Sequence, residues 1–293
     1  MPDALDRIEI DANGVRFHAL AAGPADGPLA LCLHGFPDAA PTWRHLLPAL
    51  ADAGFRAVAP WMRGYAPTEV PADGRYQMGA VVADAEALHE ALGADSRAVL
   101  IGHDWGAVAA YGIASFAADR WRRLVTAAVP PAASVGAGLL SYAQLKRSFY
   151  IWLFQTPLAE IAVSADDLAF IDGLWADWSP AYDASGDLPA VKDALRDPAN
   201  LAAAIGYYRA ALGTTPPDPA LDAEQAALGA TPPQPTLYLH GADDGCMGAE
   251  MAAGADAFLS PGSRIEMVSG AGHFLHVERP DVVNPMIVDW VSA

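Results

Sequence analysis

The sequence has few cysteines, few basic residues and no long apolar run, and each scarcity excludes a class of protein. It contains two cysteines, Cys32 and Cys246, which are too few for a disulfide framework and lack metal-ligand spacing. Lysine and arginine number 17 against 35 aspartate and glutamate, a formal net charge of −18, which argues against nucleic acid and anionic membranes as partners. No apolar run reaches the ~18 residues of a membrane span. The N-terminal segment is acidic, where a secretory signal is basic and then apolar, so we expect a cytoplasmic protein.

The order of apolar segments is typical of an α/β protein with one insertion. A hairpin over residues 7–22, turning at Asn13-Gly14, precedes alternating strands and helices. We expect strands at 29–33, 55–59, 99–101, 124–129, 236–240 and 265–268, and helices at 42–53, 78–92, 247–259 and 281–291. Such alternation predicts a mostly parallel sheet with helices on both faces.

A stretch without clear strands interrupts this alternation from about Ala132 to Pro233. It holds short helical patterns at 141–154, 165–175, 188–195 and 200–211, separated by proline and glycine. One core with a helical insertion explains this order better than two serial domains. We therefore predict core segments at 1–132 and 233–293, with a helical cap at 133–232 inserted after the sixth strand.

A sharp turn between a strand and a helix carries an aspartate. The apolar run ending at Ile101 stops at Gly102-His103-Asp104-Trp105-Gly106, and an alanine-rich segment follows. Glycines two positions before and after Asp104 permit this turn, because a Cβ there would collide with the neighbouring backbone. The helix that follows would direct free amides at the carboxylate and favour its ionised form. The motif alone also fits a solvated Asp in a glycine-rich turn, with roughly even odds, so the rest of the chain must decide.

A nucleophilic aspartate forms an ester, and hydrolysis of that ester needs water activated by a base and a group that orients the base. His273 lies in a glycine-rich loop after the strand at 265–268, where an imidazole can reach over the sheet. His276 competes for this role, but we expect it to be structural. The adjacent acids Asp243 and Asp244 follow the strand at 236–240, and either could orient the base. Nucleophile, acid and base follow one another in the order typical of α/β hydrolases.

Attack on the ester builds negative charge on a carboxyl oxygen, so preorganised donors are required beside the nucleophile. The segment His34-Gly35-Phe36-Pro37 follows the strand at 29–33. We expect the backbone amides of Phe36 and Trp105 to form this oxyanion hole.

These motifs together resemble the α/β hydrolases of the epoxide hydrolase and haloalkane dehalogenase group over nearly the whole chain. The resemblance rests on HGFP (34–37), WRHLLPALADAGFRAVAP (43–60), RGY (63–65), GHDWG (102–106), LFQTP (153–157), YYR (207–209), the acid turn and GHFLHVERP (272–280). It implies the α/β-hydrolase fold, with Asp104 as nucleophile, His273 as base and Asp244, rather than Asp243, as the orienting acid. It also implies no cofactor and no metal.

The resemblance is strongest to epoxide hydrolases because of two cap tyrosines. Tyr150 and Tyr208 resemble the pair that protonates the epoxide oxygen in that family, although Tyr207 could replace Tyr208. A phenol suits this role since its pKa of ~10 keeps it protonated at neutral pH. The resemblance therefore implies a small hydrophobic epoxide and water as substrates and a vicinal diol as product. Trp152 and Phe154 are expected to bind the apolar substrate.

Three alternatives are weighed against epoxide hydrolysis. A haloalkane or haloacid dehalogenase would use the same triad but needs a second halide donor beside Trp105. Phe36 stands where some dehalogenases place asparagine, which weakens this alternative, although an indole such as Trp152 or Trp175 could serve. An inert binding module is disfavoured by the intact triad. A serine esterase is disfavoured because no serine occupies the elbow.

Overall fold

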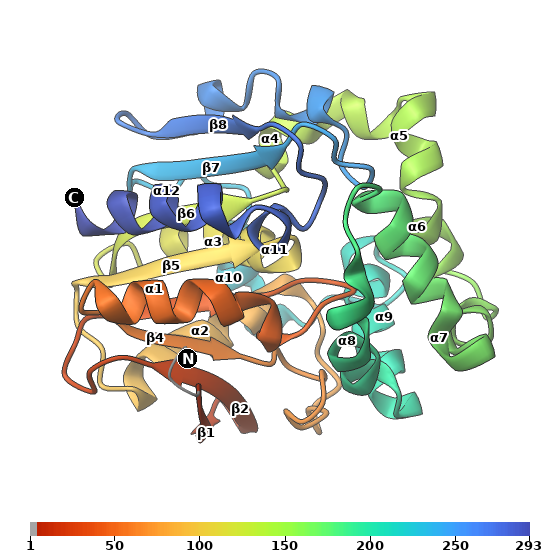
Figure 1. The fold of residues 1–293 in the computed structure, drawn as a ribbon. Helices are drawn as coiled ribbons and strands as arrows, with labels where there is room; N and C mark the ends of the chain where they lie inside the picture. The colour runs from red at the N-terminus through yellow and green to blue at the C-terminus, as the bar shows by residue number, and fades with distance from the viewer. Residues whose placement is uncertain (1–4) are drawn as a thin grey trace.

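A central sheet flanked by helices supports a layer of cap helices at the carboxyl ends of its strands (Figure 1). The computed structural model describes residues 5–293, and the first four residues of the acidic N-terminal segment lie outside it. The strands are β1 (Asp6–Ala12), β2 (Val15–Ala22), β3 (Leu29–Leu33), β4 (Arg56–Pro60), β5 (Ala98–His103), β6 (Trp121–Ala127), β7 (Thr236–Gly241) and β8 (Arg264–Val268). They form one sheet in the order β1-β2-β4-β3-β5-β6-β7-β8.

The sheet is parallel except at one edge. The hairpin β1–β2 is antiparallel, with Ala12 paired to Val15, and β2 runs antiparallel to β4. The remaining neighbours are parallel. Every residue of β3, β5 and β7 is buried, which explains why these strands read as continuous apolar runs rather than alternating ones.

Helices cover both faces of the sheet, and this confirms the predicted α/β-hydrolase architecture. In Figure 1 the helices α1 (Leu46–Asp52), α11 (Leu275–Glu278) and α12 (Pro280–Ser292) lie in front of the sheet. The helices α2 (Met78–Ala91) and α3 (Trp105–Phe116) lie behind it and pack against each other. A buried ion pair ties α2 to the loop after β4, because Asp84 accepts hydrogen bonds of 2.6 Å from Nε and Nη2 of Arg63.

The cap lies between β6 and β7 in the sequence, as predicted. Its helices are α4 (Ala132–Val135), α5 (Tyr142–Arg147), α6 (Phe149–Leu153), α7 (Ala159–Trp178), α8 (Leu188–Leu195) and α9 (Pro198–Ala211). Helix α7 is interrupted at residues 165–168, where the backbone is not helical. The last helix of the interval, α10 (Asp222–Ala227), packs against α2 and α3 of the core. The cap boundaries at 133 and 232 stay a prediction.

The prediction of a helix at 247–259 is wrong. That segment forms two short 3-10 helices, η5 (Ala249–Ala252) and η6 (Ala255–Phe258), because Gly254 between them adopts a left-handed φ of 77°. Both cysteines are free and buried. Within residues 5–293, no helix combines the length and the apolar character that crossing a membrane requires.

Candidate active site

The nucleophile elbow has the strained geometry that its glycines predict. Asp104 stands between β5 and α3 with φ 53° and ψ −117°, a conformation that side-chain-bearing residues rarely adopt. A Cβ at Gly102 would lie 2.1 Å from the carbonyl oxygen of Gly106, and one at Gly106 would lie 2.1 Å from that of Leu33. Because no such Cβ is present, the elbow can turn tightly and present the Asp104 carboxylate at the end of the sheet.

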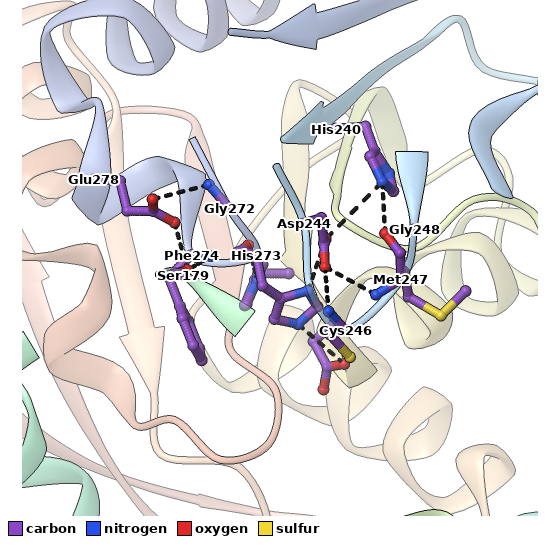
Figure 2. Close-up of polar contacts among 12 residues, drawn as sticks. Ser179, His240, Asp244, Cys246, Met247, Gly248, Gly272, His273, Phe274 and Glu278 are labelled. Carbon is purple, nitrogen blue, oxygen red and sulfur yellow. Dashed lines mark hydrogen bonds and ion pairs between the residues drawn. The ribbon is translucent and has the colours of Figure 1, made fainter. Parts of the chain in front are cut away.

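His273 connects the Asp104 carboxylate to that of Asp244. Its Nδ1 donates to Oδ2 of Asp244 over 2.9 Å, and its Nε2 lies 3.6 Å from Oδ2 of Asp104. The other oxygen of Asp244 accepts the amides of Cys246 and Met247, at 2.7 and 2.8 Å, so its carboxylate is fixed (Figure 2). Asp243 is exposed. The structure thus brings Asp104, His273 and Asp244 together and leaves Asp243 outside.

Four groups that the sequence prediction missed hold the His273 loop in place. The His273 amide donates to the carbonyl of Trp178, and His103 Nε2 donates to the carbonyl of His273, both at 3.0 Å. Glu278 accepts the Gly272 amide and the Ser179 hydroxyl at 2.8 and 2.6 Å (Figure 2). Glu278 belongs to the segment GHFLHVERP, but its partner Ser179 lies in the cap, and no local pattern in the sequence links the two.

The charges of the triad favour an ionised nucleophile. Burial alone would raise the pKa of Asp104, but the hydrogen bond and charge of His273 outweigh it and lower that pKa. Burial would lower the pKa of His273, but the Asp244 and Asp104 carboxylates on its two sides raise it to about 10. The free site therefore holds an imidazolium between two carboxylates at neutral pH.

The candidate oxyanion donors lie beside one oxygen of Asp104. The Phe36 amide donates to Oδ1 of Asp104 over 2.8 Å. Trp105 is the first residue of α3, so its amide is one of the four at the helix start that lack an intrahelical acceptor. The Phe36 contact fits the predicted oxyanion hole, and the role of the Trp105 amide stays a prediction.

A cavity of about 320 Å³ opens beside Asp104. Tyr150 and Tyr208 also line it, with ring centroids 5.6 Å apart. The remaining wall is mostly apolar and includes Val108, Val129, Val135, Leu139, Leu228 and Met247. The nucleophile and both phenols therefore face one apolar space.

The structure separates the two adjacent tyrosines of α9. Tyr208 lines the cavity, and within residues 5–293 its buried hydroxyl has no hydrogen-bond partner. The Tyr207 hydroxyl instead donates to the carbonyl of Arg63 over 3.0 Å. Tyr150 also lines the cavity, and its hydroxyl lies 3.5 Å from Sγ of Cys246. Burial raises the pKa of Tyr150 and Tyr208 well above 10, so both phenols carry their protons at neutral pH.

Trp152 and Phe154 are not among the residues that line this cavity, so it does not support the prediction that they bind the substrate. Trp152 is 45% exposed on the cap surface, because α6 directs it away from the core. Phe154 is fully buried behind the tyrosines, with its ring 5.1 Å from that of Tyr208. Trp175 does not line the cavity either, and its Nε1 donates a hydrogen bond to the carbonyl of Pro37 over 2.8 Å.

Within residues 5–293, two buried groups of side chains have the spacing of metal ligands. Asp244, Cys246 and His273 form one group, and its imidazole and carboxylate already bond to each other. Asp38, His103 and His276 form the other group. His276 contacts Thr42 over 2.5 Å and stacks on Trp43, so it is structural, as expected.

Comparison with known proteins points to a single family. The α/β hydrolase fold family matches residues 28–280. The chain is 31% identical to epoxide hydrolase 4 of Mus musculus, covering 96% of this chain and 77% of that one. It is 30% identical to epoxide hydrolase A of Mycobacterium tuberculosis, covering 97% and 96%. The crystal structure of epoxide hydrolase A from Mycobacterium thermoresistibile superposes with a TM-score of 0.80 at 26% identity, over 98% of each chain.

Proposed function

Because the chain belongs to the α/β hydrolase fold family and is similar to epoxide hydrolases over nearly its whole length, we propose that it converts a hydrophobic epoxide and water to a vicinal diol. The observation that supports this most directly is the convergence of Asp104, Tyr150 and Tyr208 on one apolar cavity. A carboxylate and two protonated phenols are the groups that ring opening requires.

In the first step, Asp104 attacks one carbon of the epoxide. A carboxylate oxygen forms a bond to that carbon while the carbon–oxygen bond of the ring breaks, and the ring oxygen takes a proton from Tyr150 or Tyr208. The product is an ester between Asp104 and the hydroxyalkyl group. The lowered pKa of Asp104 keeps the attacking form populated at neutral pH.

In the second step, water hydrolyses the ester. The phenolate left by ring opening takes the proton of the His273 imidazolium, so that His273 is neutral. His273 then removes a proton from water, and the hydroxide adds to the carboxyl carbon of Asp104. The oxyanion that forms is stabilised by the Phe36 amide, which already contacts Oδ1. Collapse breaks the ester bond, and the second water proton passes to the departing alkoxide to give the diol. Asp104 is left ionised beside protonated His273, as in the free site, so that one epoxide and one water give one diol.

The dehalogenase alternative receives less support from the same site. It needs a second N–H donor beside Trp105, and the Trp175 indole is bonded to the Pro37 carbonyl. Trp152 is 45% exposed and lies outside the cavity. Two buried phenols, which halide release does not require, occupy the cavity instead. An assay of epoxides for diol and of chloro- and bromoalkanes for halide separates the two chemistries, and we expect diol only.

A single turnover in ¹⁸O water tests the covalent mechanism. We expect the label to enter the Asp104 carboxylate, because water attacks the ester at the carboxyl carbon and not at the alkyl carbon. The His273→Gln variant should accumulate the alkylated enzyme, detectable as a mass increase on the peptide that contains Asp104. Label that enters only the diol during the first turnover would disprove the ester.

A further inference from the structure

We propose that the substrate is a terminal epoxide with one hydrocarbon arm, because the site is open on one side of the nucleophile and closed on the other. This inference rests on the proposed function and specifies the substrate class. The cavity volume, about 320 Å³, is at the lower end of the ~300–1,000 Å³ of small-molecule sites. The site thus has room for one arm of modest size.

The open side lies between α3 and the segment that follows β6. Val108 and Tyr111 line it from α3, and Val129, Val135 and Leu139 line it from the opposite segment. The Tyr111 hydroxyl is already bonded to Thr126 Oγ1 over 2.8 Å. A polar substituent on the arm would therefore lose its water without gaining a partner from these side chains.

The closed side is a block of aromatic rings that contacts both phenols. Phe154 lies 5.1 Å from Tyr208 and 5.7 Å from Tyr150, and Phe36 lies 5.4 Å from both Phe154 and Tyr208 (centroid distances). Phe36 and Phe154 have no exposed surface, and neither lines the cavity. Close-packed rings leave no space for a substituent without displacement.

An epoxide bound for reaction must place its oxygen at the phenols and one ring carbon at Asp104. The substituent of one ring carbon can then extend along Val108 toward Leu139, while the other ring carbon faces Phe36 and Phe154. An unsubstituted CH₂ fits against these rings, whereas an alkyl group would overlap them. The two sides of the site therefore select one substituted carbon and one CH₂.

Two isomeric epoxides, 1,2-epoxyhexane and trans-3,4-epoxyhexane, test this selection because they have the same molecular formula and differ only in the position of the ring. We expect kcat/KM for 1,2-epoxyhexane to exceed that for trans-3,4-epoxyhexane by at least about tenfold, the scale on which pocket sterics discriminate. Comparable values for the two isomers would overturn the inference and leave the proposed function intact. If neither isomer nor 1,2-epoxypropane yields diol, the proposed function fails as well.

Two variants test whether the open side at Val108 and the closed side at Phe154 cause this preference for a terminal epoxide. Val108→Phe fills the open side, so it should lower kcat/KM for 1,2-epoxyhexane by about tenfold or more and affect 1,2-epoxypropane less. Phe154→Ala opens the closed side and should raise the relative rate of trans-3,4-epoxyhexane. Ile161→Ala, at a cap side chain that is 68% exposed, is the matched control and should leave the isomer ratio unchanged. A Val108→Phe variant that folds and treats 1,2-epoxyhexane and 1,2-epoxypropane as the wild type does would contradict the placement of the arm, even if Phe154→Ala fails to fold.

Discussion

The pKa of His273 should depend on whether Asp104 carries a charge, and the Asp104→Asn substitution isolates this effect. Asp104 Oδ2 lies 3.6 Å from His273 Nε2. At an effective dielectric constant of ~20, removing that charge changes the free energy of His273 ionisation by about 4–5 kcal/mol. Since one pH unit corresponds to ~1.4 kcal/mol, the pKa of His273 should fall by about three pH units, from about 10 to about 7.

The same loss of charge occurs when Asp104 becomes an ester, so His273 should turn into a base only after alkylation. Alkylation requires ionised Asp104. Because the pKa of Asp104 is lowered, alkylation should persist on the acid side of neutrality. Hydrolysis requires neutral His273 and should decline as the pH falls below about 7. The sequence alone predicts a pKa near ~6.5, moved only by Asp244, and it does not distinguish the free enzyme from the ester.

Titration of the imidazole nitrogens by ¹⁵N NMR measures this pKa directly, with His273→Gln to assign the resonance. Asp243→Asn removes the charge of an exposed neighbour of Asp244 and serves as the matched control. We expect it to leave the His273 pKa within a few tenths of the wild-type value. A His273 pKa that changes by less than one pH unit in Asp104→Asn would refute this electrostatic coupling.

Three further predictions concern catalysis and stability. Tyr150→Phe combined with Tyr208→Phe should slow epoxide alkylation by ~10²-fold or more in single-turnover measurements, because ring opening then lacks its proton donors; an unchanged rate would remove the tyrosines from the mechanism. Asp84→Ala leaves the Arg63 charge buried and should cost about 3–5 kcal/mol in urea unfolding, whereas Asp95→Ala, at an exposed pair with Arg97, should hardly change the midpoint. Asp104→Gly should be more stable than Asp104→Ala by about 1–2 kcal/mol, because only glycine adopts this backbone without strain; thermal unfolding that ranks the two in the opposite order would argue against strain at the elbow.

The parts of the site that follow from local rules could be predicted from the sequence. A run such as Leu29–Leu33 is apolar throughout because both faces of β3 are covered. The continuous apolar run therefore predicted this strand at its observed bounds. The elbow could be predicted because its steric requirement is local. A Cβ at Gly102 or Gly106 would collide with the backbone, and both glycines lie within two residues of Asp104. Chain order then identified His273 and the acid turn.

The parts that depend on tertiary packing could not be predicted. Tyr207 and Tyr208 are adjacent on α9 and point about 100° apart. Only the docking of α9 decides that Tyr207 reaches the Arg63 carbonyl and Tyr208 the cavity. The burial of Phe154 and the exposure of Trp152 likewise depend on which face α6 turns inward. Composition alone treats these aromatic residues as equivalent.

The insertion of the cap between β6 and β7 has a consequence for biosynthesis. The two strands are hydrogen-bonded neighbours, yet the whole cap is translated between them, with 108 residues separating Ala127 from Thr236. At ~5–20 residues per second, β6 is therefore an unpaired edge for roughly 5–20 s on the ribosome. Such an edge can pair with other chains, and charged residues discourage this. Arg122 and Arg123, near the start of β6, place two positive charges on the strand during that interval.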